Sequence, residues 1–147
     1  LIAAEICAIV KNIIAIACGI SEGLKLGQNA KAAIVMQGIS EIEMLCNKIA
    51  KGCQINTPAG FGDIFLTCSS SKSRNNSLGL RIAKGEKFAE IKNEGKTFEG
   101  AINAELIEKL AQKLSLNLPL CSAVNKALQD MELSEIQESI IKAALDI

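Results

Sequence analysis

The first twenty residues of the chain constrain its fold most, because apolar side chains occupy every face of the helix that they predict. A helix that is apolar all round lies at the centre of a domain rather than on its surface. The longest uncharged stretch near the start, residues 12–21, is well short of the ~20 residues that span a bilayer, so we do not expect a transmembrane helix there. Residues 2–20 therefore predict a buried core helix.

The overall composition favours helices. The 147 residues fit one domain with a single core. Hydrophobic residues make up 49% of the chain and aromatic residues only 3%, which is typical of packed helices rich in Ile, Leu and Ala. We predict an all-α domain of about six to eight helices around the N-terminal one. The 16 basic and 16 acidic residues balance, which argues against a nucleic-acid partner.

Six cysteines raise the question of a metal site or disulfides. No two of them form a C-x-x-C pair and the chain has no histidine, so we expect no metal site. A reduced thiol among apolar residues behaves as a small hydrophobic group. We therefore expect inert thiols and a reducing, cytoplasmic compartment. The six are Cys7, Cys18, Cys46, Cys53, Cys68 and Cys121.

Two features of the sequence suggest that the chain is one domain of a longer protein. It opens on Leu1, inside the apolar pattern and without a basic leader or cleavage site. It also carries no Gly-x-Gly-x-x-Gly motif after a strand pattern, so no nucleotide-binding half is visible. We interpret residues 1–147 as a single domain.

Turn and capping residues divide the rest of the chain into further helices. A second helix follows Asn29, whose side chain can cap it. Residues 101–114 predict an amphipathic surface helix. Pro119 suits the first turn of another helix, and SEIQ at residues 134–137 matches a capping box for a last helix that ends near Leu145. The apolar line on the amphipathic helix consists of Ile102, Leu106, Leu110 and Leu114.

Residues 53–79 differ from the rest because glycines and polar residues are dense there, which is typical of loops. A short helix is expected from Pro58 with Thr57 as its cap, and another over residues 78–84.

Lys11 is the one charged residue in the stretch AIVKNIIAIACGIS. Its neighbours one helical turn away are apolar or small. Burial disfavours the charged form of an amine, so a buried Lys11 can exchange a proton near neutral pH, as acid–base catalysis requires. The alternative is a lysine at the domain edge that extends its ammonium group to water. The sequence alone leaves both open.

Three further places carry groups suited to chemistry. The SRNNS segment, residues 73–77, places a hydroxyl, a guanidinium and an amide at a helix start, which suits either an anion or an ordinary N-cap. Asp63 can cap a helix or orient the ammonium group of Lys11. Glu99 is either an acid favoured by the helix dipole or a ligand for an external group.

Four segments follow one another along most of the chain: VKNIIAIACGISEGLKLGQNAKAAIVMQG, GFGDIFLTCSSSKSRN, EGKTFEG and LPL. In this order and spacing they resemble the C-terminal substrate domain of the NAD(P)-dependent glycerol-3-phosphate dehydrogenases. The resemblance implies a helical domain like the C-terminal domain of 6-phosphogluconate dehydrogenase. It also implies a preceding nucleotide-binding domain, which this chain lacks.

The resemblance implies a role for each candidate residue. Lys11 would give a proton to the carbonyl oxygen of dihydroxyacetone phosphate, and accept one from sn-glycerol 3-phosphate, while hydride moves to or from NAD or NADP. Asp63 would orient Lys11 and contact the substrate. The other implied substrate-binding residues are Asn12, Thr67, Ser73, Arg74 and Asn75, and the implied cofactor contacts are Arg74 and Glu99. A homodimer is implied as well.

Some positions depart from the family pattern. Asn76 and Ser77 follow SRN where the family often has another basic residue, Gln37 replaces an arginine, and Glu22 replaces an aspartate. These changes concern phosphate affinity and domain contacts rather than the reaction class. Two alternatives are a dehydrogenase of the same design for another small keto or hydroxy acid, and a non-catalytic helical oligomerisation module.

Overall fold

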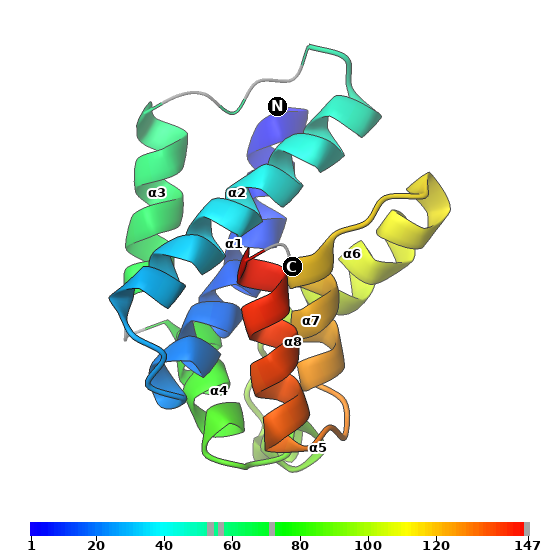
Figure 1. The fold of residues 1–147 in the computed structure, drawn as a ribbon. Coiled ribbons are helices and arrows are strands. Elements are labelled where there is room, and N and C mark those ends of the chain that lie inside the picture. The colour runs from blue at the N-terminus through cyan, green and yellow to red at the C-terminus, as the bar shows by residue number, and fades with distance from the viewer. Residues whose placement is uncertain (53–54, 56–57, 71–72, 146–147) are drawn as a thin grey trace.

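The computed structural model describes residues 1–52, 55, 58–70 and 73–145 of the chain. Within these residues the chain forms eight α-helices, one 3-10 helix and no strand (Figure 1). The prediction of an all-α domain is confirmed. The elements in chain order are α1 (Ile2–Gly23), α2 (Gln28–Ile49), α3 (Pro58–Ser69), α4 (Arg74–Ala83), α5 (Phe88–Ile91), η1 (Lys92–Glu94), α6 (Glu99–Leu114), α7 (Pro119–Ala127) and α8 (Leu133–Leu145).

Helix α1 is the central element, as its all-round apolar sequence predicts. It packs against α2, α3, α4, α6 and α7, and its residues 13–21 are all buried. Figure 1 shows α2 crossing in front of it, with α3 and α6 on opposite sides. By length and composition α1 could also cross a membrane, but 50% of its most apolar window is buried inside the fold. Core helices of globular domains pass the same test.

Helices α1 and α4 approach so closely that their backbones touch. A Cβ atom at Gly79 would lie 2.7 Å from the amide nitrogen of Ile20 and 2.9 Å from the Cα of Gly19. A Cβ at Gly19 would collide with the backbone of Asn76. Both glycines are therefore required by space, and their contact holds the start of α4 against the core helix.

A buried carboxylate joins α2 to α7. The Glu41 side chain is fully buried, and its two oxygens accept hydrogen bonds from the backbone N–H groups of Leu120 at 2.6 Å and Cys121 at 3.0 Å. These N–H groups belong to the first turn of α7 and have no partner within the helix. The Gln37 side chain donates to Glu41 at 3.0 Å and so supports this contact.

Two predicted caps are wrong. Gly27, with φ of 93°, precedes α2, and no side chain caps that helix, so Asn29 lies inside the first turn. Helix α8 begins at Leu133, one residue before the predicted capping serine. Its capping bond instead runs from the backbone N–H of Glu132 to the carboxylate of Glu135 at 3.3 Å. The predicted cap Thr57 lies outside the described residues.

In its first two turns helix α6 packs on a different face than the sequence pattern predicts, whereas Leu110 and Leu114 of that pattern pack against the core. Its buried residues are Gly100, Ala104, Ile107 and Ala111, whereas Ile102 and Leu106 of the predicted apolar line are 61% and 51% exposed. Small residues let α6 approach α1 closely. The face that carries them is therefore buried, and the more hydrophobic face with Ile102 and Leu106 stays exposed.

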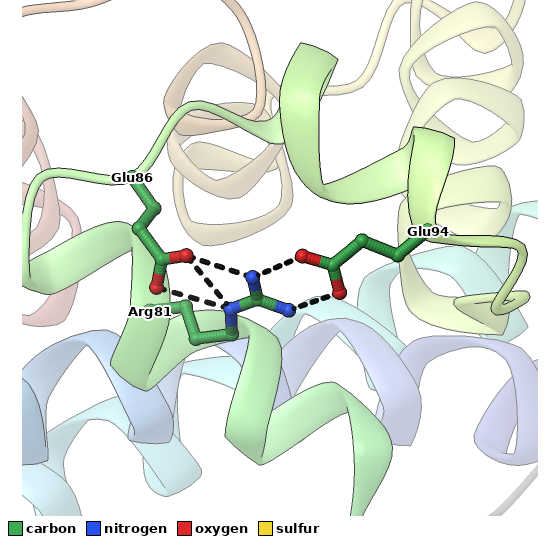
Figure 2. Close-up of polar contacts among 3 residues, drawn as sticks. All are labelled: Arg81, Glu86 and Glu94. Carbon is green, nitrogen blue, oxygen red and sulfur yellow. Dashed lines mark hydrogen bonds and ion pairs between the residues drawn. The ribbon is translucent and has the colours of Figure 1, made fainter.

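An exposed ion-pair cluster braces the segment that leads from α4 to α6. The Arg81 guanidinium donates to the carboxylate of Glu86, with contacts down to 2.7 Å, and to that of Glu94, with contacts down to 2.6 Å (Figure 2). The hydrogen bonds to Arg81 lower the pKa of both carboxyl groups, and they raise the pKa of Arg81 further above its usual range. The cluster ties η1 to α4 ahead of the start of α6.

Candidate functional site

Lys11 and Asp63 meet on the surface between α1 and α3. The ammonium nitrogen of Lys11 donates to Asp63 Oδ2 at 3.1 Å, and the two side chains are 26% and 64% exposed. Lys11 is therefore neither sealed in the core nor extended alone into water, the two possibilities that its sequence window left open. The structure instead gives it the carboxylate partner that we considered for it.

Two buried thiols, one of them beside Lys11, have a raised pKa. The Cys68 thiol lies 3.8 Å from the backbone oxygen of Lys11, to which it donates. Its hydrogen bond with Cys18 and its burial raise its pKa well above the usual range. Burial, with the nearby Glu41 carboxylate, likewise raises the pKa of Cys121. A thiol with a raised pKa is a poor nucleophile, which agrees with the predicted inert role. Cys53 lies outside the described residues.

The SRN residues form the first turn of α4. Ser73 is its N-cap, and its hydroxyl accepts from the backbone N–H of Asn76 at 3.4 Å. The N-cap interpretation of Ser73 is thus confirmed, and it is compatible with anion binding at the same helix end. Arg74 is the first residue of the helix and is exposed, whereas Asn75 is only 8% exposed.

Two contacts join these residues to the start of α6. The Asn75 Oδ1 atom accepts from the backbone N–H of Gly100 at 3.0 Å. The Asn12 side chain donates to Glu99 at 3.4 Å and to the backbone oxygen of Ala8 at 3.3 Å. Residues from four helices, α1, α3, α4 and α6, therefore contribute to one region around the middle of α1.

The structure does not bring all the predicted residues into contact. Thr67 is half-buried on α3, and among the described residues no hydrogen bond links it, or Arg74, to another predicted site residue. The sequence analysis also missed Gly100, which contacts Asn75. The one available signal was the EG pair of the TFEG segment, where a glycine follows an acid at a helix start.

Two hollows on the described part of the surface are lined by residues other than the predicted site residues. One of about 280 Å³ lies between the α4–α5 turn and α8, and Phe88, Met131 and Ile136 contribute to its wall. Another of about 290 Å³ lies against Phe98 and Ile102 at the start of α6. Lys11 and Asp63 line neither of these two hollows.

The fold and this region together define an all-helical domain with a lysine–carboxylate pair beside a polar helix N-terminus. Residues 1–138 match the family model described as "NAD-dependent glycerol-3-phosphate dehydrogenase C-terminus". The chain belongs to this family.

Named relatives support the assignment. A glycerol-3-phosphate dehydrogenase (NAD(P)+) of Aromatoleum aromaticum is 39% identical over 145 residues, which are 96% of this chain and 44% of the relative. One from Wolbachia pipientis wMel is 45% identical over 139 residues, or 88% of this chain and 42% of the relative. The chain thus spans less than half the length of these relatives.

Solved structures show the same fold. The crystal structure of glycerol-3-phosphate dehydrogenase from Coxiella burnetii aligns with a TM-score of 0.83 and 39% identity, over 94% of this chain and 44% of that one. The enzyme from Saccharomyces cerevisiae aligns with a TM-score of 0.78 and 26% identity, over 91% of this chain and 40% of that one.

Proposed function

We propose that this chain is the substrate-binding and catalytic domain of an NAD(P)-dependent glycerol-3-phosphate dehydrogenase. The enzyme would interconvert dihydroxyacetone phosphate and sn-glycerol 3-phosphate by hydride transfer. The observation that carries the proposal is the contact of Lys11 with Asp63 at 3.1 Å, in a chain that belongs to this family. The nucleotide-binding domain would come from a part of the protein outside this chain.

Lys11 is the proposed general acid. Hydride addition to a ketone builds negative charge on its oxygen, so a nearby acid must supply a proton as the charge develops. The ammonium group of Lys11 can donate that proton, and the resulting amine can accept it back in the reverse reaction. Asp63 accepts one ammonium hydrogen and so fixes the direction of the others. Both groups are reachable from solvent, as a substrate requires.

The first turn of α4 is the proposed phosphate site. Free N–H groups and the helix dipole favour an anion there, and the Arg74 guanidinium can add paired hydrogen bonds. Asn75 adds an amide, while Ser73 contributes by capping the helix. Asn12 and Thr67 would line the substrate pocket between this turn and Lys11. Phosphate binding would hold the reacting carbon in place for hydride transfer.

Two exposed residues of this chain fit a nicotinamide dinucleotide. The guanidinium of Arg74 suits the phosphates of the cofactor, and the carboxylate of Glu99 suits its hydroxyl groups. Bound NAD or NADP would accept or supply the hydride. This chain would contribute those two contacts, and most of the cofactor site would lie on the nucleotide-binding domain.

Partners and compartment complete the proposal. The exposed apolar side chains of Ile102 and Leu106 on α6 support a contact with another domain or subunit, in keeping with a homodimer. The burial of Cys68 and Cys121 among apolar residues is in keeping with reduced thiols, and so with the reducing, cytoplasmic compartment that forms part of this proposal.

Substrate comparison in the full-length protein that carries this chain tests the proposal. Dihydroxyacetone phosphate should be reduced with NADH or NADPH, and unphosphorylated dihydroxyacetone or keto acids should react far more slowly. Arg74→Ala should raise the KM for dihydroxyacetone phosphate by about 10- to 100-fold, the effect of one charged hydrogen-bonding group. Lys109→Ala, which removes a 72% exposed cation on α6, is the control and should leave this KM unchanged. Preference for an unphosphorylated keto acid would contradict the proposal.

A further inference from the structure

Two consecutive residues at the start of α6, Glu99 and Gly100, each contact a different part of the proposed site. The backbone N–H of Gly100 donates to Asn75 Oδ1 at 3.0 Å, in a buried contact. The preceding residue, Glu99, accepts from the Asn12 side chain at 3.4 Å. Asn75 belongs to the proposed substrate site and Glu99 to the proposed cofactor site. A displacement of this turn would therefore reach both.

The missing side chain at position 100 makes this arrangement possible. A Cβ atom there would lie 2.7 Å from the backbone oxygen of Asn12, and 2.8 Å from both Asn75 Oδ1 and Ile16 Cδ1. Distances below 3.0 Å are essentially never found for real Cβ atoms. Gly100 lies inside α6 with no positive φ, so space rather than backbone conformation requires glycine here. Two of the three crowded atoms belong to site residues.

The same contact fixes which way the Asn75 amide faces. A backbone N–H can only donate, so the atom that meets it must be the amide oxygen. The nitrogen of Asn75, with two donor hydrogens, is then left for another acceptor. A pair of N–H donors beside Arg74 suits a phosphate oxygen and rejects a second donor.

We propose that Gly100 is a positioning residue that couples the substrate and cofactor sites through the first turn of α6. It holds Asn75 with its donor hydrogens toward the substrate, and it keeps Glu99 beside Asn12. The inference rests on the proposed function, because that proposal assigns Asn75 to the substrate and Glu99 to the cofactor.

Four variants of the full-length protein separate this role from a merely structural one. Asn75→Ala should raise the KM for dihydroxyacetone phosphate by about tenfold or more and leave the cofactor KM within about twofold. Glu99→Gln should raise only the cofactor KM. Gly100→Ala should raise both by about tenfold, because it displaces both groups. Gly38→Ala is the matched control: its Cβ would collide with the Ile14 side chain where α2 packs on α1, and not with Asn12, Asn75 or Glu99, so it should lower the melting temperature without changing either KM.

The outcomes distinguish the two proposals. If Asn75→Ala raises the substrate KM but Gly100→Ala matches Gly38→Ala in both KM values, the coupling role of Gly100 is wrong and the proposed function stands. If Asn75→Ala leaves the substrate KM unchanged, the assignment of Asn75 to the substrate fails, and the coupling fails with it.

A further variant covers the case in which Gly100→Ala does not fold. Asn75→Asp keeps an oxygen that accepts from Gly100 N–H but replaces the donor group with a second oxygen. It should melt within about 2 °C of the wild type, above Asn75→Ala, and should raise the substrate KM by about tenfold or more. A wild-type substrate KM in Asn75→Asp would overturn the inference.

Discussion

Two helix contacts hold the two halves of the candidate site, and they differ in kind. Helix α4 meets α1 through Gly19 and Gly79, backbone against backbone, and both glycines are buried. Helix α3 presents Asp63 to α1 at the surface, where this aspartate is 64% exposed. Packing fixes the proposed phosphate half, whereas groups open to solvent form the proposed proton-transfer half. Substitutions at the α1–α4 contact should therefore change the free energy of unfolding, and substitutions at the Lys11–Asp63 pair should change kcat.

The largest expected loss of stability comes from Gly79→Ala. Its Cβ would lie 2.7 Å from the nitrogen of Ile20, and backbone atoms in a helix cannot yield as a side chain can. Overpacking of this kind should lower the free energy of unfolding by about 3 kcal/mol, measured by urea denaturation. Gly62→Ala is the control, since nothing lies within 4 Å of its Cβ, and it should not destabilise the protein. Equal stability of the two variants would contradict the tight α1–α4 contact.

Glu41→Ala should have the next largest effect. It removes the acceptor for the N–H groups of Leu120 and Cys121, which then lie buried without a partner. The expected loss is about 2–3 kcal/mol, seen as a lower melting temperature. Glu41→Gln retains one carbonyl oxygen and should lose less. If the two variants melt together at the wild-type temperature, Glu41 does not stabilise the start of α7.

Asp63→Asn should separate chemistry from stability. An exposed ion pair contributes less than about 1 kcal/mol, so the free energy of unfolding should scarcely change. The kcat should nevertheless fall by about 10- to 100-fold, because the proposed acid loses the group that orients it. Glu105→Gln removes a carboxylate that is as exposed as Asp63 and pairs with Lys109, and it should change neither quantity. A normal kcat in Asp63→Asn would make the Lys11–Asp63 contact incidental.

The smallest effect is expected for Arg81→Ala, which removes another exposed ion-pair cluster. The folded-state pKa of Glu86 and Glu94 lies below the ordinary value of 4.5, so the cluster contributes stability above that pH. This contribution is lost as the pH falls through the lowered values. The melting temperatures of wild type and variant should differ by about 2 °C or less at neutral pH, and should converge below pH 4.5 and in high salt. A difference in melting temperature that increases as the pH falls would contradict this account of the cluster.

Local patterns were enough to predict much of the fold. The buried α1 follows from its all-round apolar sequence, the start of α7 from Pro119, and the N-cap of α4 from Ser73. Each signal lies within one or two helical turns of the element that it predicts. Lys11 stood out for the same reason, since it is a lone charge in an apolar helix.

Contacts between distant segments could not be predicted in this way. Glu41 and Leu120 are 79 positions apart, and Asn75 and Gly100 are 25 apart, so no local pattern records either contact. The packing of the first two turns of α6 was missed because close approach to α1 favoured small residues over the more hydrophobic Ile102 and Leu106. The pairing of Lys11 with Asp63 was only one of two possibilities until α3 could be placed beside α1.

The proposed role of Lys11 is tested most directly by the kcat of Lys11→Ala in the full-length protein with dihydroxyacetone phosphate and NADH or NADPH. Loss of the general acid should lower kcat by roughly two to four powers of ten, while the melting temperature and the cofactor KM stay near those of the wild type. Lys109→Ala should retain full kcat. A folded Lys11→Ala variant with wild-type kcat would contradict the assignment of Lys11 as the proton donor.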